Sequence, residues 1–324
     1  MIKSASSIIL AFGLILSCVA APVSAATADK DLTMSLIDKD SNMLLTNEDL
    51  KHVSNEPRTP EQYLSKTDLI EKIKEADAAT GKDNFLNVIN STDSSIMNAI
   101  SFNQDGTLRV NKSKIKANDE VASKEIENVE NALKEYTDKL KEFNKKQGIE
   151  SNGLDITPNG EISISGNIGG NGDGVNSLTL QGRDKGDIVL QNDPGLSIQG
   201  YINHAGIYDG TTSDVCIYTA QPDIGVTWET VDQWRNHDDA YVLTTGYTTA
   251  TQASAFNWAY SLAGYGETYY WYAGKDDDDS WYCSKVAWRG YDMMAIDLDY
   301  NGGYWVFPDD ILQSSKTYLA AAYY

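Results

Sequence analysis

The sequence predicts an α+β protein in which a mainly helical N-terminal region precedes a region of strands and packed helices. Three observations support this class. All seven tryptophans and 17 of the 19 tyrosines follow residue 200, so the large rings that build cores and clefts are concentrated in the second region. Residues 119–147 carry apolar side chains at alternating steps of four and three, which is typical of a helix face. Short apolar runs at 188–190 and 204–208 have the length of strands.

Residues 1–25 have the pattern of a signal peptide. A lysine precedes an apolar run from Ile8 to Leu16, which is too short to span a bilayer, and Val23-Ser24-Ala25 fits a signal peptidase site. A lipoprotein box ending at Cys18 is a second interpretation, but the cleavage site follows so closely that simple cleavage is favoured. We therefore expect a secreted or cell-envelope protein, and no later segment is apolar enough for a membrane span.

Two helices and two hairpins are predicted in the region 26–150 and just after it. The first helix starts at Thr59-Pro60 and ends at Gly81, since proline suits a helix start and glycine a helix end. The second covers 119–147 and allows a short coiled coil, although packing on its own domain or on a second copy is the preferred interpretation. Its apolar seam comprises Ala122, Ile126, Val129, Leu133, Tyr136, Leu140 and Phe143.

The dipeptides Asp105-Gly106 and Asn159-Gly160 suit hairpin turns with positive φ. Residues 166–177 are too rich in glycine for regular structure and are expected to form a flexible connection. The domain boundary is therefore placed within 151–182, and the second domain covers 183–324.

The net charge of −21 argues against two classes of partner, nucleic acid and anionic lipid surfaces. Nucleic acid and anionic lipid repel such a chain, so neither is expected as a partner. Calcium loops space their ligands at alternate positions, whereas Asp276–Asp279 are contiguous, so this run is expected to face water or a cation as an acidic loop. His204 and His237 lack the spacing of zinc sites, and we predict neither a metal nor a cofactor.

Cys283 stands among aromatic residues at the predicted start of a helix. As a nucleophile it would need a base, because a free thiol with a pKa near ~8.5 is mostly protonated at neutral pH. The chain has three histidines, and the last of them is His237, so the base must precede the cysteine in the sequence. This order is the reverse of that in papain.

The block YWYAGKDDDDSWYCSKVAW resembles the tyrosine, paired small residues and DCSG motif of NlpC-type cell-wall peptidases, with Tyr270, Ala273-Gly274 and Cys283-Ser284 in the matching places. GDIVL followed by HAGIYDG is similar to two strands of the same family. The blocks occur in swapped order, as in the circularly permuted papain-like hydrolases of the YiiX/YebB-like group. The ending VFPDDILQSSKTYL also resembles that group, so the resemblance covers roughly residues 183–320.

The resemblance implies a thiol hydrolase in which Cys283 attacks a carbonyl and His204 shuttles the proton. Asp279 or Ser280 could cap a helix whose first turn contains Cys283, and the positive end of that helix would favour the thiolate. The group usually has a glutamate on the next strand to orient the histidine. Thr219 stands in that place and carries no charge, which leaves open whether Gln221 orients the histidine or the site is inactive.

The resemblance also assigns the oxyanion donors to the backbone N–H of Cys283 and the hydroxyl of Tyr270. Trp281, two residues before the cysteine, is expected at the cleft. An amide in a cell-envelope peptide, such as a peptidoglycan stem, is the first expected substrate, and an ester or lipid acyl group is the second.

Four alternatives compete with the hydrolase. Cys283 could form a disulfide with Cys216, although strand alternation directs Cys216 away from the face that Thr219 would share with the groove. His204 could be a buried histidine satisfied by a carbonyl. The protein could also be a non-catalytic binding domain, in which His204 would lack an orienting partner, or a surface protein that acts through its helical half.

Overall fold

The computed structural model describes residues 63–102, 108–115, 119–149, 155–156, 162–163, 175–222 and 224–324. All of them fall in one compact unit, Met43–Tyr324. The helices, in chain order, are α1 (Thr67–Thr80), α2 (Lys82–Ser91), α3 (Ser94–Met97), the 3-10 helix η3 (Lys112–Lys114), α4 (Glu120–Lys146), α5 (Val231–Arg235), α6 (Thr249–Leu262), α7 (Cys283–Asp292) and α8 (Pro308–Gln313). The strands are β1 (Ile100–Phe102), β2 (Leu108–Val110), β3 (Asp155–Ile156), β4 (Ile162–Ser163), β5 (Ile188–Asn192), β6 (His204–Tyr208), β7 (Val215–Gln221), β8 (Gly225–Thr230), β9 (Asp239–Thr245) and β10 (Thr317–Tyr323).

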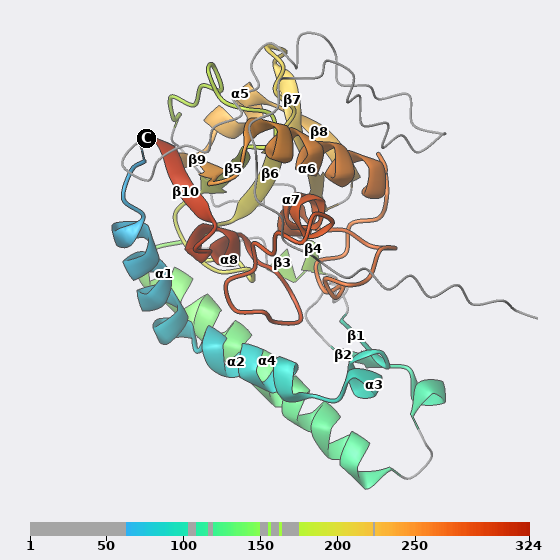
Figure 1. Cartoon of the computed structure of the whole chain (residues 1–324). Helices are drawn as coiled ribbons and strands as arrows, with labels where there is room; N and C mark the ends of the chain where they lie inside the picture. Colours follow the sequence, from blue (N-terminus) through green and yellow to red (C-terminus); the bar gives the residue numbers. More distant parts are fainter. Residues whose placement is uncertain are drawn as a thin grey trace, which may run out of the picture. The chain divides into compact units, whose positions relative to one another are not determined.

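The main sheet has six strands in the order β10-β9-β5-β6-β7-β8, and each neighbouring pair is antiparallel. Helix α7 packs on β6, on β7 and on α6 (Figure 1). The α+β class with an antiparallel sheet, packed helices and a helical N-terminal region is thus confirmed. The central strand β5 is buried along its whole length.

The two faces of the sheet feed two hydrophobic clusters. Ile188 and Leu190 belong to the large cluster that includes α6 and α7, whereas Val189 between them belongs to a smaller cluster with Trp234 of α5. Neighbouring residues of a strand point to opposite faces, so a continuous apolar run is what a strand covered on both faces requires.

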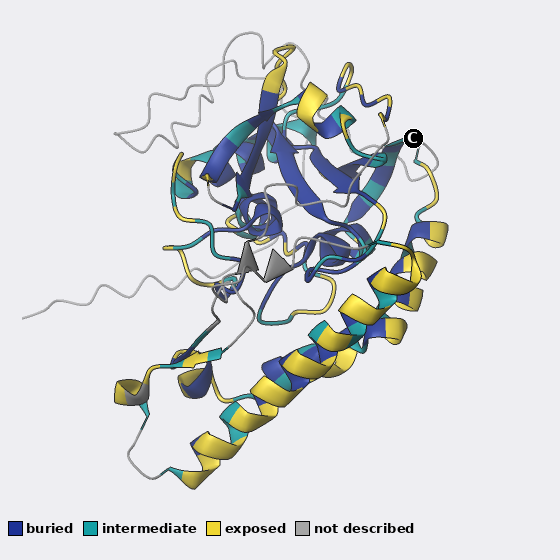
Figure 2. Ribbon diagram, turned by 180° about the vertical axis from the view of Figure 1, so that it is seen from behind, coloured by how far each residue is buried: buried dark blue, intermediate teal, exposed yellow. Residues whose placement is uncertain are grey.

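Helix α4 follows the seam that the sequence predicts. Asp119 caps its start by accepting hydrogen bonds from the backbone N–H groups of Val121 and Ala122. The seam is buried or half-buried against α1 and α2, and the opposite face is exposed (Figure 2). The seam therefore packs within the chain, and self-association through this helix stays a prediction.

The start of the first helix differs from the prediction, while its end agrees. Helix α1 begins at Thr67, seven residues after Pro60, which lies outside the described residues. Gly81 ends α1 in the left-handed region at φ 73°, and α2 starts at the next residue. Both hairpins are present, with Ile100 opposite Val110 and Ile156 opposite Ile162, although their turn residues lie outside the described ranges.

The helical region and the sheet domain share one core. Residues of α1, α2 and α4 belong to the same hydrophobic cluster as those of β5 and α7, and the ring of Phe85 lies 5.8 Å from that of Trp305. The predicted boundary at 151–182 and the predicted flexible connection fall mostly on residues outside the described ranges. Within the described part of the chain, no helix combines the length and apolar character needed to cross a membrane.

Candidate active site

Cys283 is the first residue of α7, as predicted, but the cap of the helix differs from the prediction. Tyr282 occupies the N-cap position in an extended conformation, and no side chain caps the helix, so neither Asp279 nor Ser280 has that role. The first N–H groups of a helix have no acceptor within it, and they form its positive end. Cys283 is therefore placed at this positive end, and it is fully buried.

His204 is the first residue of β6, and an aromatic ring fixes the plane of its imidazole. The indole of Trp234 stacks on it with 4.9 Å between ring centroids and 23° between the ring planes. Gly206, two residues along the same strand face, makes room for this arrangement. A Cβ there would lie 2.5 Å from Cγ2 of Ile217 and 3.1 Å from Cζ2 of Trp234, so the packing explains the glycine.

The carboxylate beside His204 belongs to Glu229 of β8, a residue that the sequence reasoning missed. Its Oε2 lies 3.3 Å from Nε2 of His204, and both side chains are 3% exposed. The amide of Gln221 donates to the other carboxylate oxygen of Glu229. Gln221 therefore contacts the carboxylate that faces the histidine.

Thr219 also reaches the histidine, but in a weaker way. Its hydroxyl lies 3.4 Å from Nε2 of His204 and donates to the carbonyl of Ala205 at 2.6 Å. Strand pairing explains how Glu229 comes to the same place: Thr219 lies opposite Thr227 in the register of β7 and β8, so Glu229 projects from the same face one step further. A usable signal was present, because Glu229 and Glu267 are the two glutamates after residue 200.

The imidazole and the thiol meet. Burial by itself lowers the pKa of His204, but the charge of Glu229 and a hydrogen bond with Cys283 outweigh this effect and raise the pKa to about 10. Nδ1 of His204 is buried and has no hydrogen-bond partner among the described residues. The structure thus brings together the two side chains that the swapped motif order implied.

Two further polar groups line the sulfur. The thiol of Cys283 donates to Oε1 of Gln199 at 3.4 Å, and Nε2 of Gln199 lies 3.4 Å from the hydroxyl of Tyr269. Burial raises the pKa of Tyr269, and the charge of Cys283 raises it further. The neighbouring Tyr270 pairs through its backbone with Trp281, and its role as an oxyanion donor stays a prediction.

Trp281 is fully buried, so its ring is not exposed on an open cleft wall. The ammonium of Lys285 lies 5.1 Å from its ring centroid and donates to the backbone carbonyls of Gly274, Asp277 and Ser280. A cation from α7 thus holds the acidic loop from within. On the outer side of the loop, Arg289 pairs with Asp278 at 3.1 Å.

Cys216 and Cys283 are both free, so the disulfide alternative does not describe this structure. Burial raises the pKa of Cys216 to about 12, as expected for an apolar thiol in a core. In the part of the chain that the structure describes, no group of three or more histidine, cysteine, aspartate or glutamate side chains is arranged to hold a metal ion.

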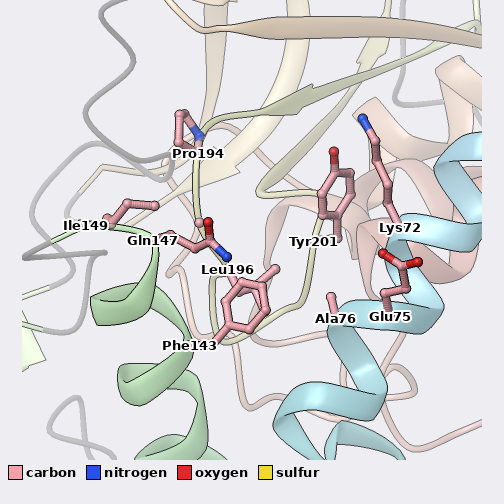
Figure 3. A pocket seen from close by; sticks show the side chains of 10 residues that line it. Lys72, Glu75, Ala76, Phe143, Gln147, Ile149, Pro194, Leu196 and Tyr201 are labelled. Carbon is pink, nitrogen blue, oxygen red and sulfur yellow. The ribbon is translucent and has the colours of Figure 1, made fainter.

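A cavity of about 430 Å³ lies between α1, α4 and the segment 194–201 (Figure 3). Its lining does not include the cysteine or the histidine, but the segment that forms one wall also carries Gln199. The residues that line the cavity are Lys72, Glu75, Ala76, Phe143, Gln147, Ile149, Pro194, Gly195, Leu196 and Tyr201.

A cysteine at a helix start beside a histidine on an antiparallel sheet is the arrangement that papain-like thiol hydrolases use. Residues 183–301 match the family model described as permuted papain-like amidase enzyme, YaeF/YiiX, C92 family. This part of the chain is therefore similar to the permuted papain-like amidase family. The match includes all three of His204, Glu229 and Cys283.

Two known proteins are similar to part of this chain. Uncharacterized protein YycO of Bacillus subtilis (strain 168) is 29% identical over 136 residues, which are 41% of this chain and 54% of that protein. The chain therefore spans about half the length of this curated relative. The crystal structure of metalloprotein yiiX from Escherichia coli O157:H7 is similar at 17% identity and a TM-score of 0.34, and the match covers 43% of this chain and 96% of that one.

Proposed function

We propose that the protein is an exported thiol hydrolase that cleaves an amide bond in a cell-envelope peptide, such as a peptidoglycan stem. The observation that carries the proposal is the buried chain of contacts from Cys283 to His204 and from His204 to Glu229. A nucleophile, a base and a group that orients the base are the parts that acyl transfer needs.

The reaction proceeds through an acyl-enzyme. The sulfur of Cys283 attacks the carbonyl carbon with its proton already held by His204, and the carbonyl oxygen becomes an oxyanion. The imidazolium returns the proton to the leaving amine as the C–N bond breaks. A water molecule, deprotonated by His204, then attacks the thioester and releases the carboxylic acid and the free thiol.

The oxyanion needs donors close to the sulfur. The backbone N–H of Cys283 is one, because the first N–H groups of a helix lack an internal acceptor. Two side-chain groups lie near the sulfur: the amide of Gln199 contacts the thiol, and the hydroxyl of Tyr269 contacts that amide. We propose that Gln199 donates from Nε2 once substrate is bound, with Tyr269 behind it.

The paired histidine favours an enzyme over a binding domain. A domain that had lost its activity would not need a carboxylate beside a buried imidazole, because the burial of a charged group is unfavourable unless it is paired. Thr219 contributes less than Glu229 to orienting the imidazole of His204.

The peptide substrate is proposed from the resemblance to NlpC-type peptidases, and export is proposed from the signal-like residues 1–25.

The test uses the chain from Ala26 onward, with the Cys283→Ala variant as its control. Incubation with purified peptidoglycan fragments is expected to release a new free amine, and rapid quenching should trap an acyl group on Cys283 that mass spectrometry can locate. Turnover of esters without cleavage of any envelope peptide would shift the assignment to an esterase. Absence of acylation at Cys283 with every substrate would end the hydrolase proposal.

A further inference from the structure

Lys82, from the helical N-terminal region, is buried beside the loop 196–202, which contains Gln199. It is the first residue of α2, and its side chain is 3% exposed. Its Nζ donates to the carbonyl of Gln199 at 2.8 Å and to Oδ2 of Asp309 at 2.8 Å. Burial alone would lower the pKa of Lys82, but Asp309 and Asp77 outweigh burial and raise it, so the ammonium keeps its charge.

Asp309 holds the same loop from the other side. Its side chain is fully buried, and its two oxygens accept the backbone N–H groups of Tyr201 at 3.0 Å and Ile202 at 2.8 Å. Gly200 lets the pair come this close. Its φ is +123°, and a Cβ there would lie 1.9 Å from Oδ2 of Asp309 and 2.4 Å from Nζ of Lys82.

Helix α4 contributes two more contacts to this loop. The hydroxyl of Tyr136 donates to the carbonyl of Ile198 at 2.9 Å. The amide of Asn144 exchanges two hydrogen bonds of 2.8 Å with the backbone of Leu196. The segment 196–202 is thus held through its backbone by side chains that come from α2, α4 and α8.

The same segment places a side chain on the reactive sulfur. Ser197 and Gly200 close a tight turn with two backbone hydrogen bonds of 3.0 Å, and Gln199 lies within this turn. The Gln199 side chain leaves the turn toward Cys283 and Tyr269. Lys82 therefore holds the backbone of the turn at Gln199, while the side chain of Gln199 contacts Cys283.

We propose that the helical N-terminal region is an integral part of the active site, and that Lys82 is a positioning residue that holds Gln199 against Cys283. The proposal rests on the hydrolase function argued above, and it assigns a role to a region outside the family match. Neither Lys82 nor its partner Asp309 lies within residues 183–301.

Two reactions of the same sulfur separate positioning from general damage. With p-nitrophenyl acetate, Cys283 attacks the acetyl carbonyl, an oxyanion forms, and p-nitrophenolate leaves to give acetyl-Cys283, which water hydrolyses to acetate. With iodoacetamide, the sulfur displaces iodide from a CH₂ group, and no oxyanion forms. The ratio of the acylation rate to the alkylation rate therefore reports the oxyanion donors and cancels changes in exposure or reactivity of the thiol.

The primary variant is Lys82→Met combined with Asp309→Asn, because Lys82→Met alone leaves a buried carboxylate without its cation. We expect it to lower the ratio about 10-fold or more, and Gln199→Ala to lower it by roughly 100-fold, the lower end of the range of about 10²–10³ in kcat for one oxyanion donor. Adding the pair to Gln199→Ala should lower the ratio no further, since Lys82 acts through Gln199. Tyr136→Phe keeps every charge and should lower the ratio by roughly threefold, which keeps the proposal testable if the pair variant does not fold.

Lys66→Met is the matched control. Lys66 also ties the N-terminal region to the C-terminal part, through the carbonyls of Leu312, Ser314 and Thr317, but not to the turn with Gln199. Lys66→Met should lower the melting temperature and leave the ratio of the acylation rate to the alkylation rate unchanged. An unchanged ratio in the pair variant and in Tyr136→Phe, or an equal fall in Lys66→Met, overturns the positioning role while the hydrolase stands. A wild-type chain that is never acylated at Cys283 overturns both.

Discussion

Glu229→Gln tests whether the carboxylate beside His204 orients the base. The substitution keeps the size of the side chain but removes its charge and replaces one acceptor oxygen with an N–H donor. The two groups are 3.3 Å apart and nearly inaccessible to water, so the attraction is little screened. A hydrogen bond to a charged group contributes about 1.5–3 kcal/mol, and at about 1.4 kcal/mol per factor of ten we expect acylation of Cys283 to slow by roughly 10- to 150-fold.

The assay is acetyl transfer from p-nitrophenyl acetate, followed as p-nitrophenolate release across pH 5 to 10 as about ten separate measurements per variant. Glu267→Gln is the matched control, since it changes the other glutamate of the second half. Thr219→Ala is expected to have a smaller effect, about threefold, because the hydroxyl of Thr219 already donates to the carbonyl of Ala205. If Glu229→Gln reacts at the wild-type rate and Thr219→Ala is the slow variant, the assignment of Glu229 is wrong.

Three further predictions concern stability. The pKa of His204 is raised to about 10 in the folded chain, against 6.5 for the unperturbed group, so its contribution to stability is complete below pH 6.5 and is lost as the pH rises toward 10. Chemical denaturation should show the wild type losing up to about 4 kcal/mol over this window, whereas His204→Asn should show a much smaller loss. Gly206→Ala would place a Cβ 2.5 Å from Ile217, and we expect chemical denaturation to show a loss of about 1–3 kcal/mol in the free energy of unfolding. Phe85→Ala removes a buried ring that stacks on Tyr136 and Trp305, so it should destabilise the chain by about 3–5 kcal/mol while the described helices and the sheet still melt in one transition; two separate transitions would contradict the shared core.

The features that the sequence predicted well depend on local pattern. The seam of α4 follows from side chains three and four residues apart, and β6 follows from five residues of strand-like composition. Cys283 at a helix start is likewise local, since Gly, Asp and Ser residues precede it and a helix-forming run follows. In each case one segment contains all the information that its structure needs.

The features that were missed depend on pairing between segments. Thr219 was placed beside His204 by counting along one strand, but the carboxylate comes from the next strand, and its position depends on the register of β7 against β8. The cap at Tyr282 was missed because polar side chains that could cap a helix precede it, and backbone conformation decided the outcome. Register and contact between distant strands are not readable from the periodicity of a single chain.

Lys82 and Asp309 are the extreme case, because 227 residues separate two charges that are buried together. Neither has a pattern that distinguishes it from a surface residue, and each would be unfavourable in the core without the other. Their burial therefore depends on the complete fold, in which α2, α8 and the turn at Gly200 arrive at one place. A chain whose N-terminal helices have not packed has no cation on the carbonyl of Gln199, so it lacks the restraint that keeps this side chain at the sulfur. On the proposed function, acyl transfer therefore requires the N-terminal helices to be packed, although Cys283 and His204 both lie within residues 183–301.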